Sequence, residues 1–317
     1  MEKFLSMPCC VIGAAGFLGR RLTRTLLLRG AQVTGLDIHS SESQVSPKQH
    51  YHFISGTFAE KEEEITKHFL SPERSGHETL FHMAAISHNS LCLKDPGNAV
   101  EGNVMLTKRV LEFCRKNGVK KLIYPSTGLV YGEDLNRPAK ESDPVQTFNF
   151  YCATKLAAEN LIAGYALSFG MTCIVARLSN AYGPGMSPET VTGTILRQIQ
   201  KREPIHVRDW TPVRDFIFAE DVIEGLIRLA DTIHQPGYHL FNLSTGTGSS
   251  IRTLGELASQ YAKLPLGPMA SQKELAKKTP SLILDNRLFM EKTHWKPAYS
   301  LKEGMKVSIL EAAGTPG

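Results

Sequence analysis

Residues 9–21 read Cys-Cys-Val-Ile-Gly-Ala-Ala-Gly-Phe-Leu-Gly-Arg-Arg, and this stretch decides the fold of the chain. A short apolar run leads into Gly13, Gly16 and Gly19, a spacing that predicts a strand, a tight turn and the start of a helix. Gly13 would supply the turn, Gly16 would let a pyrophosphate approach the backbone, and Gly19 would let the helix lie close to the strand. The N–H groups that begin this helix would then face an anion. A turn without a nucleotide is the alternative for these glycines alone.

An acidic residue follows at the end of the next expected strand. Leucines at helical spacing after Gly19 and a stop at Gly30 predict a helix, and residues 31–36 then predict a second strand. Asp37 at its end would accept hydrogen bonds from the ribose hydroxyls of adenosine and repel a 2′-phosphate, which favours NAD over NADP. The alternative for Asp37 is a turn residue at a strand end.

Composition and charge exclude several classes of protein. The 317 residues allow one or two domains, and a hydrophobic content of 42% supports a large core. Because no apolar run reaches about eighteen residues, we expect no membrane span and a cytoplasmic protein. The net charge of +5 is spread along the chain, which fits small anionic substrates and not nucleic acid. The histidines form no ligand cluster, so no metal is expected, and the cysteines lack Cys-x-x-Cys spacing, so they are expected as reduced core residues: Cys9, Cys10, Cys92, Cys114, Cys152 and Cys173.

Strand-like and helix-like segments alternate through the first half of the chain. Strands are expected at 50–55, 79–83, 121–124 and 172–178, and helices at 58–70, 96–118 and 151–169. This alternation predicts an α/β fold with a doubly wound parallel sheet, whose ligands lie beyond the carboxyl ends of the strands. After about residue 180 the pattern becomes mixed, with helices expected near 190–201, 219–230, 251–262 and 301–312. We interpret this part as a smaller substrate-binding domain.

A phenol and an ammonium group stand four residues apart in Tyr151-Cys-Ala-Thr-Lys155, on one face of an expected helix. An unperturbed phenol has a pKa near ~10, so a tyrosine base at neutral pH needs its pKa lowered by a nearby cation, here Lys155. Ser126 and Thr127, just past the fifth expected strand, could present a hydroxyl to a substrate oxygen. The alternatives are a core tyrosine beside a solvated lysine, and hydroxyls that cap a helix or form a turn.

With these motifs in place, the sequence resembles the extended short-chain dehydrogenase/reductase family, specifically its NAD-dependent nucleotide-sugar epimerase/dehydratase group. The resemblance covers nearly all of the chain. The matching motifs, in chain order, are Gly13 to Gly19, Phe81-His82-Met83-Ala84-Ala85, Asn103, Ser126-Thr127-Gly128-Leu129-Val130-Tyr131-Gly132, Tyr151 with Lys155, Arg177-Leu178-Ser179-Asn180-Ala181-Tyr182-Gly183-Pro184, Arg214-Asp215-Phe216-Ile217, and Trp295-Lys296-Pro297.

The resemblance implies roles for these residues. Tyr151 would be the general acid/base, Thr127 would orient substrate and phenol, and Lys155 would both lower the pKa of Tyr151 and bind the nicotinamide ribose. Asn180 and Arg214 match positions that bind the phosphates of the sugar nucleotide, with Ser126 and Thr127 also at the substrate. The expected NAD-binding residues are Gly13, Gly16, Phe17, Leu18, Gly19, Asp37, Ile38, Ala84, Ala85, Asn103, Tyr151 and Lys155.

Departures from the family pattern bear on the reaction. Gly128 and Leu129 stand where 4,6-dehydratases of the family carry the acid pair that performs the elimination, so epimerisation or a ketoreduction fits better. Thr57 replaces an aspartate near the adenine, which weakens one cofactor contact. Arg208-Asp209-Trp210 replaces a glycine-containing turn and is expected to reshape substrate selection.

The sequence therefore predicts NAD-dependent epimerisation of a nucleotide-activated sugar, most readily at C4 through a keto intermediate. The alternatives are an NAD(P)H-dependent nucleotide-sugar ketoreductase and a non-enzymatic dinucleotide-binding or sensing protein, since fold does not fix function. Residues 1–180 are expected to form a Rossmann-type NAD-binding domain, with returning segments from about 206–245, and residues 181–317 mainly a mixed α/β substrate domain. The family also suggests a homodimer through helices 97–117 and 151–168.

Overall fold

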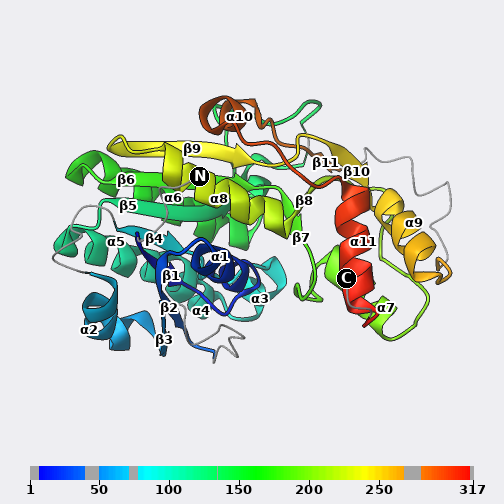
Figure 1. Cartoon of the computed structure of the whole chain (residues 1–317). Coiled ribbons are helices and arrows are strands. Elements are labelled where there is room, and N and C mark those ends of the chain that lie inside the picture. Colours follow the sequence, from blue (N-terminus) through cyan, green and yellow to red (C-terminus); the bar gives the residue numbers. More distant parts are fainter. Residues whose placement is uncertain (1–6, 40–49, 71–77, 134, 268–279, 315–317) are drawn as a thin grey trace. The chain divides into compact units, whose positions relative to one another are not determined.

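A computed structural model describes residues 7–39, 50–70, 78–133, 135–267 and 280–314 (Figure 1). The chain divides into two units, each assembled from separated segments. The first unit comprises residues 1–127, 147–177 and 223–241, and the second comprises 128–146, 178–222 and 242–317. Residues 128–146 thus group with the second unit, and the segment that returns to the first unit is 223–241.

A seven-stranded sheet forms the centre of the first unit in the described part of the chain. Its order is β3-β2-β1-β4-β5-β6-β9, and the neighbouring strands from β3 to β5 run parallel. This is the strand order of dinucleotide-binding folds, so the expected Rossmann-type sheet is confirmed. The strands are β1 (Pro8–Ile12), β2 (Gln32–Asp37), β3 (Tyr51–Ser55), β4 (Thr79–His82), β5 (Lys121–Thr127), β6 (Thr172–Leu178) and β9 (Gly237–Leu243).

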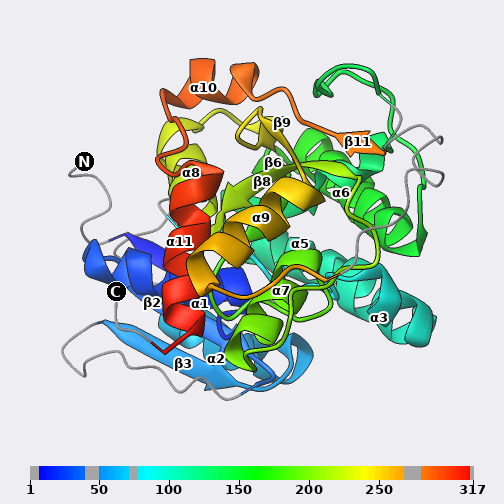
Figure 2. The same cartoon turned by 90° about the vertical axis from the view of Figure 1, so that its right-hand side faces the viewer.

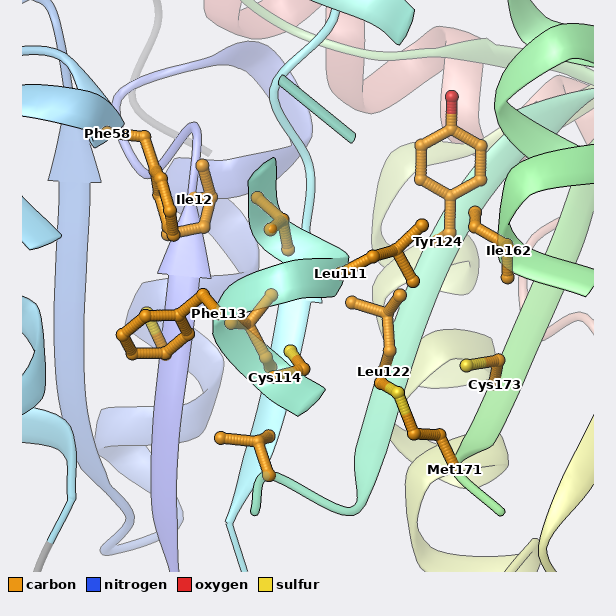
Figure 3. Packing of buried hydrophobic residues seen from close by; sticks show 14 of the residues in the cluster. Ile12, Phe58, Leu111, Phe113, Cys114, Leu122, Tyr124, Ile162, Met171 and Cys173 are labelled. Atoms are coloured by element: carbon orange, nitrogen blue, oxygen red, sulfur yellow. The ribbon is translucent and has the colours of Figure 1, made fainter. Parts of the chain in front are cut away.

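Helices of the first unit cover the sheet with apolar faces. The helices are α1 (Phe17–Leu28), α2 (Phe58–Phe69), α3 (Asn89–Lys94), α4 (Pro96–Val100), a π-helical turn (Glu101–Met105), α5 (Leu106–Asn117), α6 (Phe150–Phe169) and most of α8 (Ala219–Thr232). Side chains of α2, α5 and α6 share one buried cluster with the strands (Figure 3). In it Phe58 meets Phe113 edge to face, with ring centroids 5.6 Å apart. Such packing contributes about 0.5–1.5 kcal/mol beyond the buried area.

A smaller mixed sheet and three packed helices form the second unit. Strand β8 lies between β10 and β11 and also pairs with β7, while α7, α9 and α11 pack together (Figure 2). Trp210 is buried in this core against Gly255. The elements are a 3-10 turn (Gly128–Tyr131), β7 (Asn180–Tyr182), α7 (Val191–Gln200), β8 (Val213–Phe218), β10 (Gly248–Ser250), α9 (Ile251–Ala262), β11 (Ser281–Leu282), α10 (Arg287–Thr293) and α11 (Leu301–Ala312).

Two expectations about elements are corrected here. The sequence predicts a strand over 121–124, whereas β5 continues through Pro125 to Thr127. The helix expected over 96–118 is three consecutive pieces, although Asp95 caps it as expected by accepting a hydrogen bond from the backbone N–H of Asn98.

All six cysteines are buried and free of disulfides, as predicted. Among the described residues, no helix has the length and apolar character needed to cross a membrane.

Candidate active site

Glycines shape the turn between β1 and α1. Gly13 has a φ of +88°, and a Cβ there would lie 2.6 Å from the backbone nitrogen of Ala84, just beyond β4. A Cβ on Gly19 would lie 1.9 Å from the carbonyl oxygen of Gly13, so only glycine lets α1 begin so close to the turn. Gly16 is the N-cap of α1 and has no side chain to bond the N–H groups of the first turn. Those donors suit an anionic ligand.

Asp37 ends β2 and turns its carboxylate toward the glycine turn. Its Oδ2 accepts a hydrogen bond from the N–H of Ala15 at 2.9 Å, and its Oδ1 accepts one from the N–H of His39 at 3.0 Å. Each carboxylate oxygen has a further lone-pair site that a ribose hydroxyl could use. The strand end, the carboxylate and the turn are therefore fixed relative to one another before any ligand binds.

A cavity of about 360 Å³ opens beside Asp37, among residues that end or follow β1 to β4. Of the predicted cofactor residues, its lining includes Gly13, Gly16, Asp37, Ile38, Ala84 and Ala85. Sequence reasoning missed other lining residues, which are Ile12, Leu36, His39, Gly56, Phe58, Met83, Ile86, Asn98, Gly102 and Leu106. The rule that ligands bind beyond strand ends could have indicated Gly56 and Ile86, because they follow β3 and β4.

The lining of this cavity fits the adenosine part of NAD. Apolar walls suit a base, the Asp37 carboxylate suits ribose hydroxyls, and backbone without side chains at Gly13 and Gly16 suits a pyrophosphate. Thr57 caps α2 through a reciprocal pair of hydrogen bonds with Glu60. That hydroxyl is thus used for capping.

Asn103 does not line the cavity, but it forms hydrogen bonds with the backbone of Ile86, which does. The amide is 1% exposed; its Oδ1 accepts from the N–H of Ile86 at 2.7 Å, and its Nδ2 donates to the Ile86 carbonyl at 3.1 Å and the Thr154 hydroxyl at 2.9 Å. Asn103 belongs to the π-helical turn, a distortion that is frequent at functional sites. It thereby ties a lining residue to α6.

Thr127, Tyr151 and Lys155 gather where the end of β5 meets α6. Tyr151 is 9% exposed, and burial raises the pKa of its phenol well above the usual range, while a hydrogen bond with Thr127 acts in the opposite direction. Lys155 lies one helical turn away on the same face. The structure therefore brings together the three residues expected to carry the chemistry.

The ammonium group of Lys155 is directed at β5. Its Nζ donates to the Pro125 carbonyl at 2.7 Å and lies 3.9 Å from the centroid of the Tyr124 ring. Burial lowers the pKa of Lys155 to about 7, and the Glu159 carboxylate acts to raise it. Desolvation of the buried phenol dominates the pKa of Tyr151 in this structure, so the lowering of that pKa by Lys155 stays a prediction.

Ser126 points away from Thr127, because successive side chains of a strand lie on opposite faces. Its hydroxyl donates to the carboxylate of Glu159. Glu159 also accepts from the Arg177 guanidinium, at 2.7 Å from Nη2 and 3.2 Å from Nε. The predicted substrate residue Ser126 is thus part of a buried polar cluster with Glu159 and Arg177.

The remaining predicted substrate residues belong to the second unit. Arg214 of β8 forms an ion pair with Glu133 at 2.6 Å and donates to the carbonyls of Val213 and Pro280. Asn180 begins β7 and pairs with Phe216 of β8, two strand positions from Arg214. The same strand pair therefore carries both predicted phosphate ligands.

The first position of the missing acid pair, Gly128, is closely packed. A Cβ on Gly128 would lie 2.8 Å from both terminal carbons of Leu284 and 3.2 Å from the Leu178 carbonyl oxygen. A larger side chain would therefore require Leu284 to move. Within the described ranges, no group of three or more His, Cys, Asp or Glu side chains is arranged to hold a metal ion.

Comparison with known proteins places this geometry among NAD enzymes of sugar nucleotides. The model of the NAD dependent epimerase/dehydratase family matches residues 9–244. The UDP-glucose 4-epimerase of Mycolicibacterium smegmatis is 29% identical, over 96% of this chain and 97% of that protein. The human dTDP-D-glucose 4,6-dehydratase is 28% identical, over 84% of this chain and 76% of its own length. Among solved structures, the Thermus thermophilus UDP-glucose 4-epimerase in complex with NAD has a TM-score of 0.82 at 25% identity, covering 96% of this chain and 99% of that one.

Proposed function

Because the chain belongs to the NAD-dependent epimerase/dehydratase family, we propose that it interconverts the C4 epimers of a nucleotide-activated sugar through a keto intermediate. The observation that carries this proposal is the group formed by Thr127, Tyr151 and Lys155 at the end of β5, in the same unit as a cavity that fits the adenosine of NAD. Support also comes from relatives of nearly equal length that are named UDP-glucose 4-epimerases.

Proton transfer is the task of Tyr151. Its phenolic oxygen takes the proton of the sugar's 4-hydroxyl as the keto-sugar forms and returns a proton to the same oxygen as the epimer forms. Thr127 holds the phenol by a hydrogen bond and thereby fixes its direction. The ammonium form of Lys155, one turn along the helix, favours the phenolate over the phenol.

NAD fits the first unit through the glycine turn, Asp37 and the cavity beside them. When bound, NAD would supply a hydride acceptor for C4 and, in its reduced form, a hydride donor for the opposite face of the sugar. Asp37 would hold the ribose hydroxyls and Lys155 the nicotinamide ribose. Asn180 and Arg214 of the second unit would bind the nucleotide phosphates, since a guanidinium suits that geometry.

Elimination of water is the other reaction of the family, and the observations at residues 128 and 129 disfavour it. Gly128 has no side chain and Leu129 no charge, so no acid is present at either position. Leu284 also lies close to Gly128, so a larger side chain at residue 128 would have to displace it. Epimerisation needs neither acid.

The test is an incubation of the purified full-length protein with UDP-, GDP-, CDP- and dTDP-sugars without added cofactor, starting with UDP-glucose and UDP-galactose. We expect C4 interconversion by NMR with no net change in absorbance at the NADH band, because an epimerase keeps its cofactor through both hydride steps. Stoichiometric consumption of NAD(P)H on a 4-keto-sugar would instead identify a ketoreductase. NAD binding without turnover of any sugar would identify a sensing protein.

We also propose that the protein is a cytoplasmic homodimer that contacts its second copy through helices 97–117 and 151–168. Supporting the dimer, Leu167 near the end of α6 is an apolar side chain that is 77% exposed. Light scattering of the purified protein tests the dimer, and the variant Leu167→Glu, which introduces a charge, should shift it toward monomer.

A further inference from the structure

A buried acidic residue that the proposed reaction does not use lies on α6, one helical turn beyond Lys155. Glu159 follows Tyr151 and Lys155 at spacings of four residues, so the three side chains form one row along α6. Its side chain is 4% exposed, and that of its partner Arg177 is 6% exposed. A buried ion pair gives little stability relative to well-packed apolar residues, so its presence here invites another explanation.

The contacts of Glu159 link three elements of the first unit. Its Oε2 lies 2.7 Å from Nη2 of Arg177 on β6, and its Oε1 accepts from the hydroxyl of Ser126 on β5. Ser126 lies between Pro125, whose carbonyl receives the Lys155 ammonium, and Thr127, which holds the Tyr151 phenol. A shift of Ser126 would therefore move both partners of the catalytic side chains.

We propose that Glu159 is a positioning residue for this site: its carboxylate, anchored by Arg177, fixes Ser126 and the end of β5 and favours the ammonium form of Lys155. This inference rests on the proposed function only for its catalytic consequence. Its structural and electrostatic content concerns side chains of the first unit alone.

The other groups that face Lys155 do not replace Glu159. From β5 come the Tyr124 ring and the Pro125 carbonyl, and from α6 comes Tyr151; burial raises the pKa of both phenols, so neither supplies a negative charge in this structure. From β4 comes His82, whose pKa burial lowers to about 3, so it stays uncharged. Arg177 on β6 bonds to Glu159, and its positive charge cannot stabilise the ammonium form of Lys155. Glu159 is therefore the acidic group among the described residues that acts to keep Lys155 protonated.

The experiment follows the ionisation of Lys155 directly, in full-length protein saturated with NAD. Lysine labelled with ¹³C at Cε gives a signal that reports protonation of the amine, and Lys155→Met assigns it. In Glu159→Gln we expect the midpoint of this titration to fall by about one pH unit or more, because the amide keeps the shape but loses the charge. At a fixed pH above the midpoint, the kcat of Glu159→Gln for C4 interconversion should then be about tenfold lower than that of the wild type for each pH unit by which the midpoint falls. The KM for the sugar nucleotide should be unchanged.

Two further variants separate charge from packing. Glu159→Asp keeps the charge and should keep the wild-type midpoint, even if its shorter side chain reduces kcat. Glu112→Gln on α5 is the matched control. Like Glu159, Glu112 accepts hydrogen bonds from a hydroxyl, that of Tyr165 at 2.6 Å, and from an arginine, Arg115 at 3.0 Å, but it does not act on Lys155. It should change neither the midpoint nor the pH profile.

If Glu159→Gln alone does not fold, the double variant Glu159→Gln with Arg177→Gln leaves no unpaired charge. It should also lower the midpoint of the Lys155 titration. A midpoint unchanged within about 0.3 pH units in these variants would overturn the proposal and leave Glu159 a purely structural residue. Failure of the proposed function would look different: the wild type would show no C4 interconversion, while the Lys155 titration would still respond to Glu159→Gln.

Discussion

The hydroxyl of Tyr151 is the group on which the proposed proton transfer depends. Tyr151→Phe removes that oxygen and leaves the ring in place, so we expect kcat to fall about 10²- to 10⁴-fold, with the affinities for NAD and sugar nucleotide nearly unchanged. NMR turnover and calorimetric titrations measure the two effects. Tyr165→Phe, on the same helix and bonded to Glu112, is the control and should retain full activity. A Tyr151→Phe variant with most of its rate would contradict the mechanism.

The buried Lys155 makes stability depend on pH in a defined direction. Its pKa is about 7 in the folded chain, against a usual value of 10.5. Between these values the unfolded chain binds the proton and the folded chain has released it, so the free energy of unfolding rises with pH. Relative to Lys155→Met, we expect the wild type to gain about 1.4 kcal/mol per pH unit above pH 7. Urea unfolding of both proteins at several pH values tests this, and a constant difference would refute it.

Local spacing explains which site residues were predictable. Gly13, Tyr151 and Lys155 act within a single turn or helix, so their spacing carries the information. Glu159 was missed although it continues the row Tyr151–Lys155, because its partners Ser126 and Arg177 come from other strands. The direction of Ser126 follows from where β5 ends, and a proline at 125 made the strand look shorter than it is.

The start of α1 depends on its packing against the glycine turn. In Gly19→Ala the new Cβ would meet the Gly13 carbonyl at 1.9 Å, so α1 must move and the turn with it. We expect a loss of NAD affinity of at least tenfold and a lower melting temperature. The matched control is Gly164→Ala, also inside a helix, where a Cβ meets nothing within 4 Å. It should stabilise the protein by about 0.5–1 kcal/mol and leave NAD binding unchanged.

In the second unit, the segment after the 3-10 turn lies on β8 through the ion pair of Glu133 and Arg214. Both side chains are less than a fifth exposed, so a phosphate that binds Arg214 must compete with the carboxylate. We expect Glu133→Gln to bind UDP about two- to tenfold more tightly, because the amide competes less well with a charged phosphate. The control is Glu256→Gln, which removes the exposed partner of Arg252. Weaker UDP binding in Glu133→Gln would show that Glu133 instead prepares Arg214 for the ligand.

Element types followed from periodicity, and their exceptions have physical causes. Most helices, and the strands β1 to β4 and β6, were predicted within two residues, because apolar spacing and capping residues act locally. Strand β9 was not predicted, since its half-buried residues show no clear alternation. The π-helical turn was not predicted either, because the bonds of Asn103 to Ile86 and Thr154 depend on two distant segments.

At the scale of the whole molecule, neither unit is a continuous stretch of sequence. A fragment of residues 1–180 contains β1 to β6 but lacks residues 223–241, whose buried side chains include Leu226, Ile227 and Leu229. We expect this fragment to be sensitive to protease, to unfold without cooperativity and to bind no NAD. A fragment of residues 1–245 holds every segment of the first unit and should bind NAD; equal behaviour of the two fragments would contradict this account.

The position of β9 at the end of the sheet order also has a consequence during protein synthesis. Strand β6 is complete when residue 178 has left the ribosome, but its neighbour β9 ends at residue 243. At about 5–20 residues per second, the edge of β6 waits roughly 3–13 seconds for that neighbour. An open edge strand can pair with the edge of another chain. The speed of translation between residues 178 and 243 therefore determines how long the open edge of β6 in one nascent chain can pair with that of another chain on the same messenger RNA.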